Sequence, residues 1–234
     1  ITISRRPLTV TVDPLSKAYG DEDPAITYIT NGLVDGEVLI GSPKRNVGEI
    51  AGTYTYYLDD LNNENNPNYN ITLASGTLFT ILPRTIEISV DAVSKIYGDE
   101  DPLFTFTLTD NSALQFEDTK EDLLDQIVRQ SGENVGIYSF SVEGGNENYA
   151  ITFANPNFII SKRPVTVIAD DATKVYGDED PNFTYSATNT VEGEPVNISI
   201  RRQYGENVGE YEMVLESSND PRYEITFVPG VLNI

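Results

Sequence analysis

A six-residue phrase, Tyr-Gly-Asp-Glu-Asp-Pro, occurs three times in this chain of 234 residues. The copies begin at Tyr19, Tyr97 and Tyr176, so consecutive copies start 78 and then 79 residues apart. Identity over six consecutive positions at a nearly constant spacing indicates tandem repetition. The chain is therefore predicted to fold as three similar units, each the size of one small domain.

Further landmarks come after every copy of the phrase in the same order. They are an Asn-Val-Gly segment, a single tyrosine, and a stretch similar to Asn-Tyr-x-Ile-Thr-Phe, at 46–48, 134–136 and 207–209, then at Tyr54, Tyr138 and Tyr211, and then at 68–73, 148–153 and 222–227. A basic residue beside a proline marks each predicted boundary, near Pro7, Pro83 and Pro164. Residues 1–6 are accordingly expected to be the last strand of a preceding repeat, and 7–82, 83–163 and 164–234 to be repeats 1, 2 and 3.

Alternation of apolar and polar residues dominates the units and predicts half-buried strands. Leu8, Val10 and Val12 alternate with threonines, and the same pattern recurs at 86–90 and 165–169. The predicted fold class is all-β with at most short helical turns and five or six strands per unit. The unit is either a two-sheet sandwich or a β-grasp-like single sheet, and the three units are expected to lie end to end as an elongated rod. In repeat 2 alone, Thr119 followed by acidic residues predicts a short helical turn, with a return to β at 127–128.

Composition narrows the range of functions. The formal net charge is −22, and such a negative field disfavours nucleic acids and anionic membrane surfaces as partners. The chain contains no Cys, His or Trp, so disulfides, thiol and imidazole catalysis and His/Cys metal sites are excluded from it. No stretch of the sequence reaches the length of about 18 apolar residues that would indicate a membrane span. A non-catalytic protein that requires no cofactor is predicted.

The acidic turn within each phrase is the sharpest candidate site. Three carboxylates in one turn, with nearby help from Asp13, Asp91, Asp170 and Asp171, offer the hard oxygen ligands that calcium prefers. The competing interpretation is a solvated turn whose carboxylates bind local backbone amides, and no twelve-residue calcium-loop pattern is present. The candidate ligands are Asp21, Glu22, Asp23, Asp99, Glu100, Asp101, Asp178, Glu179 and Asp180.

The repeated tyrosines at 19, 97 and 176 are expected to be core anchors within their own units, although aromatic rings also stack on sugars. The rival function from another class is a glycoside hydrolase, which needs only two suitably spaced carboxylates. Between a passive spacer and an adhesin, the only segment without counterparts in the other units is the insert from Ser112 to Gln130. An adhesive surface, if there is one, is expected there.

With these motifs the chain resembles the YGX-type MBG repeat of large bacterial surface and adhesin-like proteins. The matching features are Lys-x-Tyr-Gly-Asp-x-Asp-Pro, Gly-Glu-Asn-Val-Gly-x-Tyr at 132–138 and 205–211, and Asn-Tyr-x-Ile-Thr-Phe. Repeat 1 is interpreted as lacking the Gly-Glu pair before its Asn-Val-Gly, with an extended turn at 49–52. The resemblance implies an extracellular or cell-surface array without catalytic residues. Its expected partners are flanking repeats and a surface glycan or protein, and the chain is expected to be a monomer.

Overall fold

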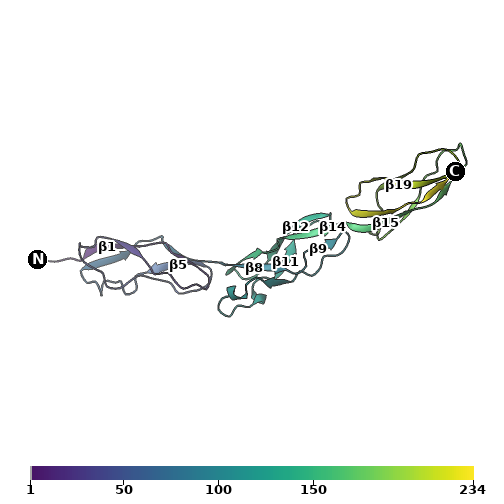
Figure 1. The fold of residues 1–234 in the computed structure, drawn as a ribbon. Helices are drawn as coiled ribbons and strands as arrows, with labels where there is room; N and C mark the ends of the chain where they lie inside the picture. The colour runs from purple at the N-terminus through teal and green to yellow at the C-terminus, as the bar shows by residue number, and fades with distance from the viewer. Residues whose placement is uncertain (1) are drawn as a thin grey trace. The chain divides into compact units, whose positions relative to one another are not determined.

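The computed structural model describes residues 2–234, and their regular secondary structure is almost entirely β (Figure 1). Each repeat contributes seven strands among the described residues. Repeat 1 has β1 (Arg6–Val12), β2 (Ser16–Ala18), β3 (Tyr28–Asn31), β4 (Lys44–Arg45), β5 (Gly52–Tyr57), β6 (Tyr69–Leu73) and β7 (Leu78–Leu82). Repeat 2 has β8 (Arg84–Val90), β9 (Ser94–Ile96), β10 (Phe106–Leu108), β11 (Gln126–Arg129), β12 (Gly136–Glu143), β13 (Tyr149–Phe153) and β14 (Asn157–Ser161). Repeat 3 has β15 (Arg163–Ala169), β16 (Ala172–Thr173), β17 (Tyr185–Thr188), β18 (Ile198–Arg202), β19 (Glu210–Ser218), β20 (Tyr223–Val228) and β21 (Val231–Asn233).

The strands of each repeat form two sheets, so the repeat is a two-sheet fold and not a single β-grasp sheet. In repeat 1 the orders are β3-β1-β6 and β2-β7-β5-β4, and repeats 2 and 3 have the corresponding orders. The pairing is mixed, because β1 is antiparallel to β3 and parallel to β6. Strand pairing stays within each repeat, as predicted. The count of seven exceeds the five or six predicted because strands such as β4 and β16 are only two residues long.

The predicted alternation sets the core. Leu8, Val10 and Val12 of β1 are buried, and the same holds for their counterparts in β8 and β15. In repeat 3, Val165 and Val167 pack with Val196 and Tyr223, whereas Ala169 packs with Met213 and Leu232 in a second cluster. The first strand of the repeat therefore supplies apolar side chains to both parts of the core.

The insert of repeat 2 forms the short helical turn that the sequence predicts. A 3₁₀ turn covers Lys120–Asp122, and the Asp122 carboxylate accepts hydrogen bonds from the Thr119 backbone N–H and hydroxyl at 2.8 and 2.7 Å. The chain returns to β at β11, again as predicted. A second 3₁₀ turn, Asn111–Ala113, precedes it.

The chain divides into two compact units, and the division passes through repeat 2 instead of between repeats. One unit contains the chain up to Ser89 together with 107–126 and 142–154, and the other contains 90–106, 127–141 and 155–234. The residues where repeat 1 meets repeat 2 thus belong to one compact unit. Those where repeat 2 meets repeat 3 belong to the other.

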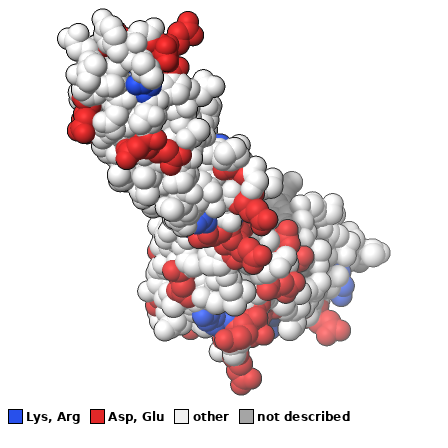
Figure 2. Space-filling view, turned by 90° about the vertical axis from the view of Figure 1, so that its right-hand side faces the viewer, with Lys and Arg blue, Asp and Glu red and all other residues white. Residues whose placement is uncertain are grey.

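The assignment of residues 1–6 to the last strand of a preceding repeat stays a prediction. Residue 1 lies outside the described residues, residues 2–5 have no regular secondary structure, and Arg6 opens β1. Among residues 2–234 no helix has the length and apolar character needed to cross a membrane. Acidic side chains gather in clusters on the face shown in Figure 2, with few basic side chains among them.

Candidate functional site

Tyr19, which comes directly after β2, packs against repeat 2. Its side chain is only 5% exposed, and its ring meets Phe116 and Tyr149 edge to face at centroid distances of 5.2 and 5.3 Å. The Tyr19 hydroxyl donates to Asp118 Oδ2 at 2.9 Å, and the Tyr149 hydroxyl donates to the same oxygen at 2.8 Å. Two aromatic contacts and a charge-assisted hydrogen bond therefore join repeat 1 to repeat 2.

Arg84, the first residue of β8, binds the same phrase from the repeat 2 side. Its Nε donates to the Tyr19 carbonyl oxygen at 2.6 Å, and its guanidinium pairs with Asp21. A further bond runs from the Ala51 backbone N–H to the Asn148 side-chain oxygen at 2.7 Å. We call this set of contacts joint 1.

Joint 2, between repeats 2 and 3, is built from the corresponding residues. The Tyr97 ring meets Tyr223 at 6.1 Å, and its hydroxyl donates to Glu194 Oε2 at 2.6 Å. Arg163 donates through Nε to the Tyr97 carbonyl oxygen at 2.7 Å and pairs with Asp99. The same four roles, an inserted tyrosine, a receiving tyrosine, a carboxylate and an arginine, are therefore filled twice.

The third phrase has the same sequence but makes no such joint with any residue from 2 to 234. Tyr176 is 64% exposed, in contrast to Tyr19. Added Cβ atoms would overlap the Gln115 side chain at Gly20 and the Val191 side chain at Gly98, but would meet nothing within 4 Å at Gly177. The prediction that these tyrosines anchor the core of their own unit is therefore wrong, because the rings at 19 and 97 are covered by the following repeat.

Burial and the shared carboxylate change the acidity of the joint 1 tyrosines. Desolvation, reinforced by the bond to Asp118, raises the pKa of Tyr19 to about 12. Desolvation is also the main cause that raises the pKa of Tyr149 to about 12. In joint 2 the hydrogen bond to Glu194 is the main cause that raises the pKa of Tyr97. The joints are therefore built for neutral tyrosines that donate to a carboxylate.

The second aspartate of each phrase belongs to an ion cluster within its own repeat. In repeat 1, Asp23 and Glu49 both contact Lys17, at 2.7 and 2.5 Å, and both contact Arg45 at 2.6 Å. The Lys17 side chain is only 4% exposed. The corresponding clusters are Lys95, Asp101, Arg129 and Glu133 in repeat 2 and Lys174, Asp180, Arg202 and Glu206 in repeat 3.

Pairing lowers the pKa of every carboxyl group in these clusters. Bonds to Arg45, Arg129 and Arg202 are the main cause for Asp23, Asp101 and Asp180. Burial alone would lower the pKa of Lys17, but its bonds to Asp23 and Glu49 outweigh burial and raise it. The clusters are thus charged on both sides at neutral pH.

The arginine of each cluster also binds the loop that leads to β5, β12 or β19. Arg45 donates to the Asn46 and Gly48 carbonyl oxygens at 3.0 and 2.6 Å, and its guanidinium lies 5.3 Å from the Tyr54 ring centre. The Tyr54 hydroxyl donates back to the Ile50 carbonyl oxygen at 2.7 Å. The counterparts Arg129 with Tyr138, and Arg202 with Tyr211, repeat this arrangement.

These contacts correct the alignment of repeat 1. A Cβ atom at Gly48, Gly132 or Gly205 would press on the ring of Tyr54, Tyr138 or Tyr211, so the three glycines are equivalent. Glu49 likewise occupies the place of Glu133 and Glu206 in the ion clusters. Repeat 1 therefore has its Gly-Glu at 48–49 with unchanged spacing to the tyrosine. The apparent match of Asn46-Val47-Gly48 to the later Asn-Val-Gly segments is wrong by four positions.

The carboxylates proposed as calcium ligands point in different directions. Asp21 and Asp99 pair with arginines of the next repeat, whereas Asp23, Asp101 and Asp180 lie in the ion clusters. Glu22, Glu100, Asp178 and Glu179 are exposed. Asp13, Asp91 and Asp170 each accept a threonine hydroxyl, at 2.6, 2.6 and 2.7 Å, and Asp171 accepts the Val231 backbone N–H at 2.7 Å. Within residues 2–234 no cluster of three or more such ligands is arranged to hold a metal, and the calcium site and the solvated turn both stay predictions.

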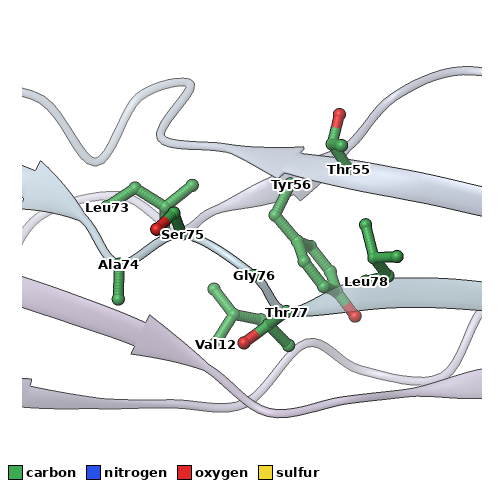
Figure 3. Close-up of a pocket in the computed structure, with 9 residues that line it drawn as sticks. All are labelled: Val12, Thr55, Tyr56, Leu73, Ala74, Ser75, Gly76, Thr77 and Leu78. Carbon is green, nitrogen blue, oxygen red and sulfur yellow. The ribbon is translucent and has the colours of Figure 1, made fainter.

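Repeat 1 contains a pocket of about 280 Å³ between the end of β6 and the start of β7. The Tyr56 ring points into it, and Val12 and Leu78 lie on either side (Figure 3). In repeat 2 the Asn155 side chain bonds the Val90 backbone N–H and carbonyl at 2.8 and 2.7 Å, whereas repeat 1 has Ser75 in this turn. The residues that line the pocket of repeat 1 include no carboxylate, so the pair that a glycoside hydrolase requires is not found there.

The insert of repeat 2 takes part in joint 1. Phe116 and Asp118 both contact Tyr19, and the Gln115 backbone N–H donates to the Tyr149 hydroxyl at 2.9 Å. Phe116 has a φ of +52°, which is rare for a residue with a side chain and costs about 1–2 kcal/mol. The segment singled out as a candidate adhesive surface therefore helps to receive Tyr19. No sequence signal distinguished this role.

A comparison with known protein families finds the same three repeats that the structure shows. The family model for the MBG domain (YGX type) matches residues 8–80, 86–159 and 165–233. Comparisons with curated proteins and with solved structures gave no match. Since the family model covers most of the chain in three copies that coincide with the three two-sheet repeats, the protein belongs to the YGX-type MBG domain family.

Proposed function

We propose that this chain is a non-catalytic spacer in an extracellular bacterial surface protein, in which the tyrosine joints fix each repeat to the next. The observation that carries the proposal is that the same joint is built twice, from residues at equivalent positions. A chain selected only for three independent domains has no need for a buried tyrosine at the boundary. Membership in the MBG family and the strongly acidic composition support the surface location.

The connections between repeats support restricted movement. Only Pro83 lies between β7 and β8, and only Lys162 lies between β14 and β15. A one-residue connection leaves little freedom, unlike flexible linkers, whose reach grows with their length. The arginine at the start of the following strand then binds back to the tyrosine of the preceding repeat, as Arg84 does to Tyr19. Each boundary is thus held on both sides of the connection.

Small-angle X-ray scattering tests the proposed spacer. The wild-type protein is expected to give a narrow distribution of maximum dimensions. A variant with Tyr19→Ala and Tyr97→Ala is expected to give a broader distribution. Tyr176→Ala, which removes an exposed ring, serves as the matched control and should scatter as the wild type does. A wild-type distribution as broad as that of the double variant contradicts the proposal.

The adhesive alternative is tested at the insert. Residues 112–130 can be exchanged for the corresponding segment of repeat 3, which supplies Glu194 as the acceptor for the inserted tyrosine. The exchange keeps a joint carboxylate while removing the surface peculiar to repeat 2. Binding to a glycan or host-protein array that is lost in the exchanged protein would establish adhesion, and the spacer proposal predicts no binding in either protein.

A further inference from the structure

The pocket of repeat 1 lies within the repeat, between its two sheets. Its lining comes from the ends of β1 and β6 in one sheet, from β5 and β7 in the other, and from the turn that connects β6 to β7. None of the lining residues belongs to joint 1, and none corresponds to a residue of joint 2. The pocket is therefore a property of repeat 1 itself and does not depend on which repeats flank it.

Repeat 1 has a smaller side chain than the other repeats at the end of β6. The strand register makes Leu73 equivalent to Phe153 in repeat 2 and Phe227 in repeat 3. In repeat 3 the Phe227 ring packs against both core clusters, one of which contains Met213, the counterpart of Tyr56. A leucine in place of this phenylalanine leaves space beside Tyr56.

The turn after β6 is also longer in repeat 1 and lies away from the first strand. Four residues connect β6 to β7, whereas three connect β13 to β14. In repeat 2 the Asn155 side chain bonds both backbone groups of Val90 and so ties the turn to β8. In repeat 3 a Cβ atom at Gly230 would lie 2.6 Å from the Ala169 carbonyl oxygen, whereas one at Gly76 in repeat 1 would meet nothing within 4 Å. The turns of repeats 2 and 3 thus close on the first strand, and that of repeat 1 does not.

The lining of the pocket is apolar and aromatic, with hydroxyl groups but no charged side chain. The buried Tyr56 ring points into the pocket between Val12 and Leu78 (Figure 3). An ionised ligand would lose hydration here without gaining an opposite charge, so the lining favours an uncharged ligand. An aromatic ligand can meet the Tyr56 ring edge to face. The side-chain hydroxyls available to a polar group on the ligand belong to Tyr56, Thr55, Ser75 and Thr77.

We propose that this pocket binds a small uncharged aromatic molecule about the size of indole. An apolar cavity of about 150 Å³ holds one benzene molecule. The pocket of repeat 1 has a volume of about 280 Å³, so it has room for two fused rings. The proposal goes beyond the spacer function and does not rest on it, because no joint residue takes part.

A titration of the whole ¹⁵N-labelled chain with indole, followed by the chemical shifts of its backbone amides, tests the proposal. Saturable shifts are expected at Val12, at Tyr56 and over 73–78. The expected dissociation constant is about 1 mM or lower, in the range open to a ligand of about nine non-hydrogen atoms. Indole-2-carboxylate adds a negative charge to the same ring system and should bind at least tenfold more weakly. Shifts that do not saturate, or that spread over exposed apolar residues outside the pocket, overturn the proposal.

Two variants close the pocket in different ways. Leu73→Phe introduces the ring that repeats 2 and 3 have, and replacement of 75–77 by the Asn-Pro of repeat 2 introduces the shorter turn. Each should weaken indole binding at least tenfold. Leu103→Phe, the same substitution at an exposed position of repeat 2, is the matched control and should leave binding unchanged.

Amide spectra and melting temperatures of the variants identify those that remain folded. Undiminished indole binding in either folded variant overturns the proposal, and so does an equal loss of binding in Leu103→Phe. The wild-type shift map decides the question by itself if both closed variants fail to fold. None of these results changes the expected scattering of the wild type, so failure here is distinguishable from failure of the spacer proposal.

Discussion

Tyr19 and Tyr176 begin the same six-residue phrase, yet one ring is buried and the other is mostly exposed. The difference lies in the neighbouring repeat, because Tyr19 is covered by Phe116 and Tyr149 of repeat 2. The ion cluster shows no such contrast, since the Lys17 and Lys174 side chains are both 4% exposed in clusters of the same composition. The phrase therefore has two roles: its Tyr-Gly-Asp faces the next repeat, and its second aspartate stabilises its own.

The largest expected effect on stability comes from removing the tyrosine ring of the phrase. Tyr19→Ala should cost about 3 kcal/mol, because truncating a buried aromatic side chain removes its packing and leaves a cavity. Tyr176→Ala should change stability little, since its ring is exposed. Urea unfolding of each variant measures the difference, with the transition that involves repeats 1 and 2 analysed separately. Equal losses for the two variants would show that Tyr19 is not a joint residue.

Alanine substitutions of the glycine in each phrase test the same difference while leaving the tyrosine ring in place. Gly20, Gly98 and Gly177 share a left-handed backbone, so alanine at any of them carries a common cost of about 1 kcal/mol. Gly98→Ala should cost about 2 kcal/mol more, because its methyl group meets the branched Val191 side chain within a packed joint. Gly20→Ala should cost less than Gly98→Ala, since the Gln115 side chain is flexible. Gly177→Ala should show the common cost alone in the same unfolding assay, and a ranking with Gly177→Ala as the most costly contradicts the joint.

Substitution of the two aspartates of one phrase separates its two roles. Asp101→Asn should lower the stability of repeat 2 by about 1 kcal/mol, a value reduced for solvent screening because about a third of the Asp101 side chain is exposed. Asp99→Asn should leave repeat 2 intact and loosen joint 2, where Asp99 pairs with Arg163. Hydrogen exchange at the backbone amides of β11 and of β15 distinguishes these outcomes. Identical protection patterns in the two variants would contradict the division of roles.

Alkaline pH should loosen joint 1 in a defined range. Folding raises the pKa of Tyr19 and Tyr149 from 10.0 to about 12, so the folded state favours the protonated rings. Their stabilising contribution is complete below about pH 10 and is lost as the pH rises through about 12. Melting temperatures of the wild type and Tyr19→Phe, measured between these values, should fall less steeply for the variant. Parallel curves would exclude a contribution from the Tyr19 hydroxyl.

Calcium should have the smallest effect. Because arginine and lysine already bind Asp99 and Asp101, titration calorimetry is expected to show no saturable heat and no gain in melting temperature. The control is the Asp99→Ala and Asp101→Ala protein, which should behave identically. A saturable heat in the wild type that disappears in this variant would establish the calcium site and require the ion clusters to rearrange.

The repeat units and their strands were predictable because local pattern determines them. Leu8, Val10 and Val12 alternate with polar residues, and such alternation has one stable solution, a strand with one buried face. The turn at Thr119 was predictable for the same reason, since a capping residue acts on its immediate neighbours.

The joints were not predictable from the same information. Tyr19 and Asp118 are 99 positions apart, and no periodicity relates them. A tyrosine that recurs in every unit is equally compatible with a core residue and with a contact to the next unit. Gly48 and Glu49 were misaligned because Asn46-Val47-Gly48 matches the later Asn-Val-Gly segments at three positions by chance. The structurally equivalent pair, Gly48-Glu49, matches at only two positions. The two aspartates of one turn look alike in sequence, and only the fold shows that one pairs with the next repeat and the other with its own.

A double-mutant cycle between Tyr19 and Asp118 tests the central claim most directly. Tyr19→Phe, Asp118→Ala and the combined variant are compared with the wild type by urea unfolding. The coupling isolates the bond between repeats from effects within each repeat. A coupling free energy of about 1–2 kcal/mol is predicted for a buried hydroxyl that donates to a carboxylate. A coupling indistinguishable from zero would show that this bond does not join repeat 1 to repeat 2.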